Sequence, residues 1–393
     1  MTKPTVDEHH RHIAELLMSV LTDRPTETVA LDDALDRVTA AAIPSPVDLP
    51  MFRNSQMDGF AVQTADLPGT LPIVGEIAAR PGAPAELAPG TAVRIMTGAP
   101  LPAGADAVVP VEDTVVEGDL VTIAHTRSVG EYVRERGSDL RSGEHLLPAG
   151  RLLAPRHLAV LAAAGLNTVV VRTKIRVAII TTGSELIEPG ATPTPGQVFD
   201  SNGTALAAAV RQTGAVVAFR RHVVDEIADM LDALSTAATS AELIITSGGI
   251  SMGDHEVVRE ALEPLGAEVI SIAMQPGGPQ ATATFEGVPV VCFPGNPVST
   301  QLSFEVFVAG LLRAAAGRRP GRFAPRILTT AVRSVEGKRQ FLRGKARADG
   351  RVEVVSGASS HLVAGLAASD LLIDVPPDVT SLEAGAEVLT WEL

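Results

Sequence analysis

Residues 242–254 read E-L-I-I-T-S-G-G-I-S-M-G-D, and this stretch decides the fold of the region around it. The apolar run 243–245 is typical of a strand that is buried on both faces. This strand ends in Gly248 and Gly249, and residues 255–262 then have the apolar spacing of a helix. Glycines at a strand-to-helix turn let the backbone approach an anion, and the N–H groups at the helix start point toward it. The stretch therefore predicts an anion-binding turn.

The acid that ends this stretch, Asp254, has two interpretations. An acid is unfavourable beside a bare phosphate but favourable beside a phosphate that carries a divalent cation. Alternatively, the turn is purely structural and Asp254 caps the helix that follows. The stretch alone supports both interpretations equally.

Residues 174–317 alternate strand and helix patterns, as a doubly wound parallel sheet does. The predicted strands are 175–180, 215–219, 243–246, 267–272 and 288–293, and the predicted helices lie near 204–212, 226–237, 255–262 and 298–315. Open sheets bind ligands beyond the carboxyl ends of their strands. The polar residues found there are Thr181, Thr182, Gly183, Ser184 and Glu185, then Asp225, then Ser247, Gly248, Gly249 and Asp254, and finally Pro294, Gly295, Asn296 and Pro297. Each acid can be a helix cap, Asp200 included, but several acids at one sheet edge favour a binding site.

Composition and charge exclude several classes of protein. The formal net charge of −14 argues against a nucleic-acid-binding surface. The single cysteine, Cys292, lies in an apolar run, which predicts a buried inert thiol in a reducing compartment. The N-terminus has no signal-peptide pattern, and the most apolar stretch, 158–171, is too short to span a bilayer. We therefore expect a soluble cytoplasmic protein that binds neither nucleic acid nor membrane.

The remainder of the chain divides by pattern into further modules. An N-terminal helix carries His9, His10 and His12, which we interpret as solvated, and a second helix at 155–165 is expected to pack beside it. The region between them is rich in short strands, Gly and Pro. The predicted domains are an elongated linker module of 1–24 plus 143–173, a β-rich insert of 25–142, an α/β domain of 174–319 and a small all-β domain of 320–393.

Three positions outside the α/β domain have simple structural interpretations. Spacing alone favours plain β-turns at Asp58-Gly59 and Thr97-Gly98. Arg343 lies in a strand pattern, where a long cation usually extends to solvent. Ser359 and Ser360 precede a short apolar segment, where a serine turn is the default.

Taken together, the motifs resemble the molybdopterin molybdenumtransferases, the MoeA and gephyrin E-domain family. The matching motifs are M-D-G-F-A at 57–61, R-I-M-T-G-A-P-L-P-A-G-A-D-A-V-V at 94–109, T-G-S-E-L at 182–186, G-Q-V-F-D-S-N at 196–202, I-T-S-G-G-I-S-M-G-D at 245–254 and F-P-G-N-P-V-S at 293–299. They occur in order and with plausible spacing over nearly the whole chain, so the set is specific although T-G-S-E-L alone would be weak.

The resemblance implies a multidomain α/β plus all-β architecture with a molybdopterin-binding α/β domain, a β-rich insert and a C-terminal β-barrel-like domain. It implies a homodimer whose cleft lies between the α/β domain of one subunit and the insert of the other. The implied reaction inserts molybdenum from molybdate into adenylylated molybdopterin, releases AMP and requires Mg²⁺. The implied catalytic residues are Asp58, Thr97 and Asp139 on the insert and Glu185, Asp225 and Asp254 on the α/β domain, and the last three are also the implied metal ligands. Further partners would be a molybdopterin adenylyltransferase and molybdoenzyme chaperones.

One segment departs from the family pattern. Family members often carry K-P-G-K-P near the metal-oxyanion site, whereas residues 275–279 here read Q-P-G-G-P. A site for a dianion would normally contain fixed positive charge. Arg343 and the hydroxyls of Ser359 or Ser360 match the family's other oxyanion contacts. We therefore predict that Arg343 is the main cation of the site and that molybdate binds more weakly than in relatives.

Two alternative functions stay open at this point. A molybdopterin adenylyltransferase has a similar α/β domain, but Asp58, Thr97 and the C-terminal domain belong to the insertase pattern. A non-catalytic scaffold of the same fold would not require the acids of the cleft, which are all present.

Overall fold

The computed structural model describes residues 3–250 and 256–393. The chain forms two compact units. The large unit comprises the described residues of Met1–Glu27, Asp36–Val38 and Arg172–Leu393, and the small unit comprises Thr28–Leu35 and Thr39–Val171.

The large unit is built on a six-stranded sheet in the order β17-β14-β18-β22-β21-β19. The strands are β14 (Arg176–Thr182), β17 (Val216–Val223), β18 (Leu243–Ser247), β19 (Glu268–Ser271), β21 (Pro279–Phe285) and β22 (Val288–Phe293). The pairs β17–β14, β14–β18 and β18–β22 are parallel, but β21 and β19 are antiparallel to their neighbours. The α/β fold class is confirmed. The prediction of a wholly parallel sheet is wrong, because the sequence pattern missed β21.

The missed strand has a physical explanation. It alternates Thr282 and Thr284 with alanine and phenylalanine, so it lacks the continuous apolar run of the central strands. A two-residue turn then joins it to β22, with φ of 48° at Glu286 and 82° at Gly287. Positive φ at both positions is the geometry of a tight hairpin, which places the two strands antiparallel.

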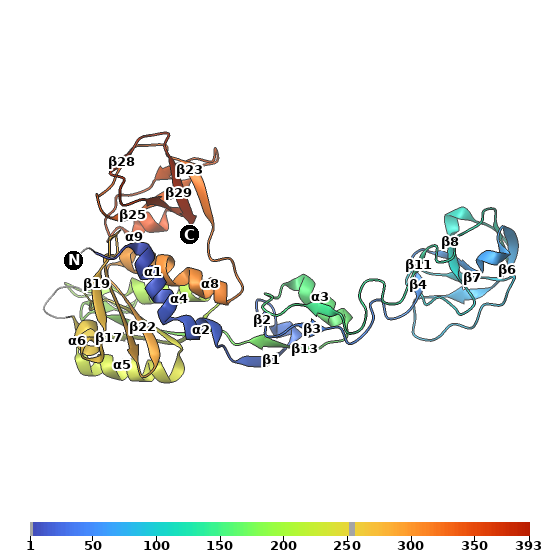
Figure 1. The fold of residues 1–393 in the computed structure, drawn as a ribbon, viewed down its shortest axis with the longest axis horizontal. Coiled ribbons are helices and arrows are strands. Elements are labelled where there is room, and N and C mark those ends of the chain that lie inside the picture. The colour runs from blue at the N-terminus through green and yellow to red at the C-terminus, as the bar shows by residue number, and fades with distance from the viewer. Residues whose placement is uncertain (1–2, 251–255) are drawn as a thin grey trace. The chain divides into compact units, whose positions relative to one another are not determined.

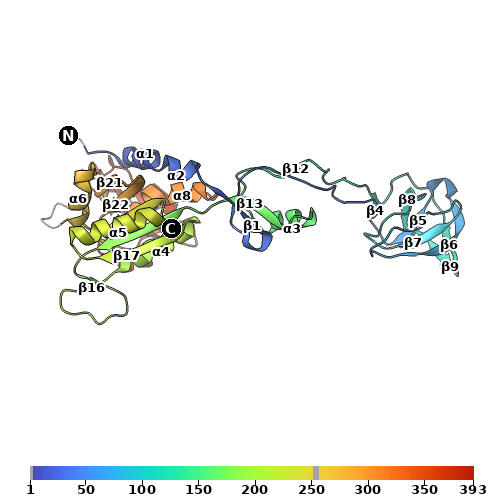
Figure 2. The same ribbon diagram turned by 90° about the horizontal axis from the view of Figure 1, so that it is seen from below.

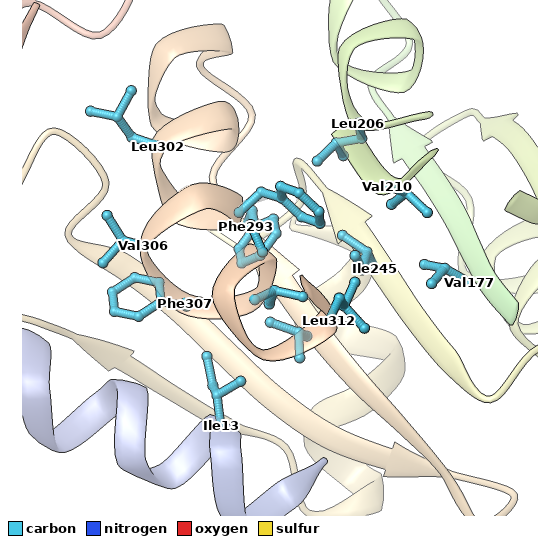
Figure 3. Packing of buried hydrophobic residues seen from close by; sticks show 14 of the residues in the cluster. Ile13, Val177, Leu206, Val210, Ile245, Phe293, Leu302, Val306, Phe307 and Leu312 are labelled. Carbon is cyan, nitrogen blue, oxygen red and sulfur yellow. The ribbon is translucent and has the colours of Figure 1, made fainter. Parts of the chain in front are cut away.

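Helices cover both faces of this sheet (Figure 1). They are α1 (Val6–Leu16), α2 (Met18–Thr22), α4 (Ser201–Thr213), α5 (Ile227–Ser240), α6 (Val257–Leu262), α7 (Pro297–Phe304) and α8 (Gly310–Ala315), and a π-helical segment, Glu305–Ala309, joins the last two. One face packs against α1, α4 and the α7–α8 helix, and the other against α5 and α6. Figure 3 shows Ile13 of α1 beside Phe307 and Leu312, with Ile245 and Phe293 on the sheet side of the same core.

The prediction that His9 of α1 is solvated is wrong. It is 2% exposed, and its ring meets the Phe307 ring edge-on with 4.9 Å between centroids. Burial lowers the pKa of His9 to about 4, with a smaller contribution from His12, so the imidazole is neutral near pH 7. The reason is helical periodicity: His9 lies on the same stripe as Val6 and Ile13, which face the core.

The C-terminal region forms the predicted β-barrel-like domain as a curled half-barrel sheet. Its strand order is β20-β25-β27-β29-β23, and β26 pairs with β25. The elements are β20 (Met274–Gln275), β23 (Phe323–Ile327), β24 (Val332–Arg333), β25 (Arg339–Ala346), β26 (Val352–Val354), α9 (Val363–Ala367), β27 (Leu371–Val375), β28 (Ser381–Leu382) and β29 (Glu387–Glu392). Because β20 belongs to the α/β segment of the chain, this sheet joins the C-terminal region to the α/β region.

The small unit contains a six-stranded sheet in the order β8-β5-β7-β6-β10-β9 (Figure 2). Its strands are β5 (Gly59–Val62), β6 (Gly69–Ile77), β7 (Ala92–Ile95), β8 (Ala107–Pro110), β9 (Val115–Glu117) and β10 (Leu120–Ile123). The shorter elements near this unit are β1 (Thr26–Ala30), β2 (Val38–Thr39), β3 (Ile43–Pro44), β4 (Asn54–Ser55), β11 (Val133–Arg134), β12 (His145–Leu147), α3 (Pro155–Ala163) and β13 (Thr168–Arg172).

The helices α3 and α1 belong to different compact units, and their expected packing against each other stays a prediction. Leu161 of α3 packs with Leu153 and Val171 in a core of the small unit. Ile13 of α1 instead packs in the core of the large unit. The bounds of the four predicted domains stay a prediction.

Two further expectations concern Cys292 and membranes. Cys292 is fully buried, as predicted. Burial raises the pKa of its thiol to about 12. In the part of the chain that the structure describes, no helix has the length and apolar character needed to cross a bilayer.

Candidate active site

A cavity of about 930 Å³ lies at the carboxyl ends of β14, β18 and β22 in the large unit. Its walls come from the sheet edge, from the turn at 275–279 and from the C-terminal segment around 358–361. The predicted site residues that line it are Thr182, Gly183, Glu185, Asp225, Gly248, Gly249, Pro294, Gly295, Asn296, Pro297, Ser359 and Ser360. The strand-end clusters seen in the sequence thus meet at one cavity.

Three other predicted residues of the large unit do not line this cavity. They are Ser184, Ser247 and Arg343, and the Ser184 Oγ accepts a hydrogen bond from the Asp225 N–H at 3.3 Å. Asp58, Thr97 and Asp139 belong to the small unit. Asp254 lies outside the described residues, so its role stays a prediction.

Asp225 holds two strand ends together at the cavity wall. Its carboxylate accepts hydrogen bonds from Thr182 Oγ1 at 2.9 Å and from the Ser184 N–H at 2.8 Å. Burial raises the pKa of this carboxyl, but the hydrogen bonds outweigh burial and hold the pKa below its usual range. Asp225 is therefore a fixed negative charge at the end of β17.

Glu185 and Gly183 form the next part of the wall. Gly183 has a φ of +149°, and a Cβ built there would lie 2.7 Å from Glu185 Oε2. Only a glycine lets the Glu185 carboxylate come this close to the backbone. The structure thereby brings two carboxylates, those of Glu185 and Asp225, to the same cavity from neighbouring strand ends.

Ser247 faces the protein interior and not the cavity. It is 1% exposed, and its Oγ accepts a hydrogen bond from Asn202 Nδ2 at 2.9 Å and shares one with Thr300 Oγ1 at 3.0 Å. The hydroxyl therefore fixes the end of β18 to α4 and α7. The hydroxyl is therefore not available to a phosphate, and the backbone of Gly248 and Gly249 would hold the phosphate instead.

Asn202 lines the cavity. It belongs to the G-Q-V-F-D-S-N motif at 196–202, but the sequence predicted no role for it. Its Nδ2 donates to Ser247 Oγ and, at 2.7 Å, to the Gly295 carbonyl. Its Oδ1 is buried and has no partner among the described residues, which is costly unless a ligand or water donates to it. The nearby Asp200 instead caps α4, accepting from Gly203 N–H and Thr181 Oγ1 at 2.9 Å each, as its capping interpretation predicted.

The Gly248 turn allows a sharp test of the cavity floor. Gly248 has a φ of +98°, and a Cβ there would lie 2.6 Å from the Thr182 carbonyl oxygen. We expect Gly248→Ala to lower the free energy of unfolding by about 3 kcal/mol or more, because left-handed strain adds to a backbone clash. Gly266→Ala is the matched control, since Gly266 has a φ of +87° but open space at Cβ. It should lose only about 1 kcal/mol in urea unfolding, and equal losses would show that the contact with Thr182 is unimportant.

Arg343 is buried and does not extend to solvent. It is 0% exposed, its Nε donates to Ser356 Oγ at 3.2 Å, and its Nη2 donates to the carbonyls of Gly357 and Ser359. Its Nη1 has no partner among the described residues. Through these contacts, Arg343 holds in place the loop that carries Ser359 and Ser360 to the cavity.

The cavity also contains cations that the sequence reasoning missed. Lys3 and Lys338 line it, one from the N-terminal segment and one from the turn before β25. Neither position has a motif that marks it. Only the fold brings residues 3, 275 and 338 together.

On the small unit, Asp58 and Thr97 form a local pair. The Asp58 carboxylate accepts from the Thr97 N–H at 2.6 Å and from Thr97 Oγ1 at 2.9 Å. These hydrogen bonds, the backbone one first, lower the pKa of Asp58. The turn predicted at Thr97-Gly98 is present, whereas the one predicted at Asp58-Gly59 is not, because Gly59 begins β5. The Asp58 carboxylate is exposed and charged. Asp139 lies on an exposed loop of the same unit.

Family models match three consecutive parts of the chain. They are the MoeA N-terminal region (domains I and II) over residues 4–165, the "Probable molybdopterin binding domain" over 178–314 and the MoeA C-terminal region (domain IV) over 325–393. A molybdopterin molybdenumtransferase 2 of Mycobacterium tuberculosis is 40% identical over 99% of both chains. The chain belongs to the MoeA family of molybdopterin molybdenumtransferases.

Other members of the MoeA family give the same result. A molybdopterin molybdenumtransferase of Nostoc is 35% identical and is matched over 99% of this chain and 94% of its own length. The crystal structure of a MoeA protein from Pyrococcus horikoshii has a TM-score of 0.86 at 30% identity and covers 100% of this chain and 99% of its own. The family and the multidomain fold that the motifs implied are confirmed.

Proposed function

We propose that this MoeA family member transfers molybdenum from molybdate to adenylylated molybdopterin and releases AMP. The observation that carries the proposal is the single cavity where three glycine-rich strand ends meet two carboxylates, Glu185 and Asp225. Glycine turns suit the phosphate groups of such a substrate. The orphaned Asn202 Oδ1 is an acceptor for an N–H or O–H of the pterin or ribose.

We propose Mg²⁺ as the cation of the site, because the donor set suits it. No three acidic, histidine or cysteine side chains gather closely enough to hold a metal by themselves in the described residues. Mg²⁺ commonly binds through one or two carboxylates together with substrate phosphates, so Glu185 and Asp225 with Asp254 fit this mode. A bound Mg²⁺ would neutralise phosphate charge and polarise the phosphoanhydride bond.

The test is an assay with purified protein, adenylylated molybdopterin, molybdate and a titration of magnesium. Release of AMP and formation of cofactor that activates a molybdenum-free enzyme are the expected results. Molybdopterin with ATP is the parallel reaction, and adenylylation in that tube without molybdenum transfer in the other would favour the adenylyltransferase alternative. No product in either tube would favour the scaffold.

We further propose a homodimer in which Asp58 and Thr97 of one subunit serve the cavity of the other. Chains carrying Asp58→Ala and chains carrying Asp225→Ala should each be inactive alone. Co-refolding equal amounts should restore about one quarter of wild-type activity, because half of the dimers are mixed and each mixed dimer has one intact site of two. Activity that stays at the level of the single variants, or a stable monomer with full activity in sedimentation, would contradict the proposal.

A further inference from the structure

The cavity has an uneven charge distribution. The acidic lining residues are Glu185, Asp200, Asp225 and Glu256, and among the described lining residues the only lysines or arginines are Lys3 and Lys338. The proposed substrates are anions, and a dianion requires positive charge or charged donors when it leaves water. The cationic part of the cavity is therefore the part where molybdate would bind.

Backbone pairing fixes where these lysines lie. Strands β20 and β25 are parallel, with Met274 opposite Arg339 and Gln275 opposite Gln340. The Arg339 N–H donates to the Ala273 carbonyl at 2.9 Å, and the Ala273 N–H donates to the Pro4 carbonyl at 2.9 Å. Lys338 and Lys3 are the chain neighbours of Arg339 and Pro4. Both lysines thus flank the segment that runs directly into the 275–279 turn.

Lys338 and Arg339 are neighbours in the chain but lie in different surroundings. Arg339 forms a bidentate ion pair with Asp374 and another with Asp7, so its charge is neutralised away from the cavity. Lys338 lies in the turn just before β25 and lines the cavity. Gln340 Nε2 donates to Gln275 Oε1 at 2.9 Å, which leaves the amino group of Gln275 as a donor. Lys338 forms no ion pair with any residue that the structure describes.

We infer that Lys338 is the main molybdate-binding cation of this protein, with Gln275 as a neutral donor beside it and Lys3 as a secondary charge. The inference rests on the proposed function. It moves the positive charge from the turn at 275–279, where this chain has Gln275 and Gly278, to the turn just before β25. It also replaces the expectation that Arg343 supplies that charge, because Arg343 is occupied by loop carbonyls.

The test is the dependence of the rate and of binding on molybdate concentration. Lys338→Ala should raise the KM for molybdate at least tenfold, about 1.4 kcal/mol, and by more than it lowers kcat. Calorimetric titration of molybdate should show the same loss without any turnover. Lys345→Ala is the matched control: it removes a lysine from an exposed position of β25, the strand that follows Lys338, and should change neither value.

A rescue variant separates lost charge from lost structure. A Cβ at Gly278 meets nothing closer than 3.5 Å, so Gly278→Lys fits the turn, unlike Gly277→Lys, where φ is +99°. Adding Gln275→Lys and Gly278→Lys to Lys338→Ala should restore tight molybdate binding and should lower the requirement of the wild type.

The inference is overturned if Lys338→Ala leaves the KM and the binding constant for molybdate unchanged, or changes them no more than Lys345→Ala does. The KM outcome requires an active wild type, whereas the binding constant does not. If the wild type itself transfers no molybdenum, the proposed function fails first, and molybdate titration still reports whether Lys338 binds the anion.

Discussion

Replacing Asp225 by Ala is expected to slow AMP release at least about a hundredfold, or roughly 2.7 kcal/mol of barrier. The carboxylate lies at the cavity wall, already desolvated in part and held by the Ser184 N–H and the Thr182 hydroxyl. A charge fixed in this way is available to a cation or a phosphate without reorganisation. The rate is measured at saturating molybdate and adenylylated molybdopterin.

Asp225→Asn separates the charge from the hydrogen bonds. Asn can still accept a hydrogen bond from Ser184 but has no negative charge, so we expect its rate to be as low as that of Asp225→Ala. Its loss in unfolding free energy should be small, about 1 kcal/mol. A rate near wild type in Asp225→Asn would show that Asp225 acts only as a structural tie between β14 and β17.

The difference in unfolding free energy between wild type and Asp225→Asn should depend on pH in a defined direction. The pKa of Asp225 is lower in the folded protein than its usual value, so the stabilisation is complete above the unfolded pKa of about 3.9. It is lost as the pH falls through the folded pKa. The difference in unfolding free energy between wild type and Asp225→Asn should therefore be constant at neutral pH and shrink in acid.

Arg343→Ala is expected to abolish molybdenum transfer and to destabilise the C-terminal domain. The guanidinium is fully buried and donates to Gly357, Ser359 and the Ser356 hydroxyl. Removing it takes away these hydrogen bonds from a charged donor and leaves an empty volume behind the loop. The lost hydrogen bonds and the cavity together should lower the free energy of unfolding by about 2–5 kcal/mol.

The same loop reaches α7, which explains why activity should fall with stability. The Ser360 carbonyl accepts from the Val298 N–H at 3.1 Å, so the loop connects the C-terminal domain to the helix beside the glycine turn at 294–297. Loosening the loop would displace Ser359 and Ser360 from the cavity wall. We therefore treat Arg343 as a positioning residue.

Arg343→Lys distinguishes positioning from direct charge. A lysine keeps the charge but cannot bridge two carbonyls and a hydroxyl with one planar group. If Arg343 positions the loop, Arg343→Lys should fail nearly as badly as Arg343→Ala, with both kcat and the KM for molybdate affected. If Arg343 contacts molybdate by charge alone, Arg343→Lys should retain most activity. Arg347→Ala, which removes an exposed arginine paired with Glu353 just after β25, is the matched control and should behave like wild type.

Local patterns in the sequence were sufficient to predict most helices and strands. They were also sufficient to predict the part of the site that lies at the strand ends. Strands such as β18 and β22 are continuous apolar runs, and glycines at their ends predicted tight turns. Because parallel strands end at the same sheet edge, Glu185 and Asp225 could be assigned to one cavity without a structure. The interpretation failed at β21, where Thr and Ala alternate, and at His9, which a helical stripe carries into the core.

The sequence by itself determined the family, the strand-end motifs and the glycine positions, because these depend on neighbours in the chain. Only the tertiary structure decided the direction of side chains and the meeting of distant segments. Ser247 turns inward to Asn202, and Arg343 is buried under its loop, because packing and not strand pattern selects their partners. Lys338 reaches the cavity because β25 pairs with β20 across more than sixty residues of chain, a contact that no local pattern encodes.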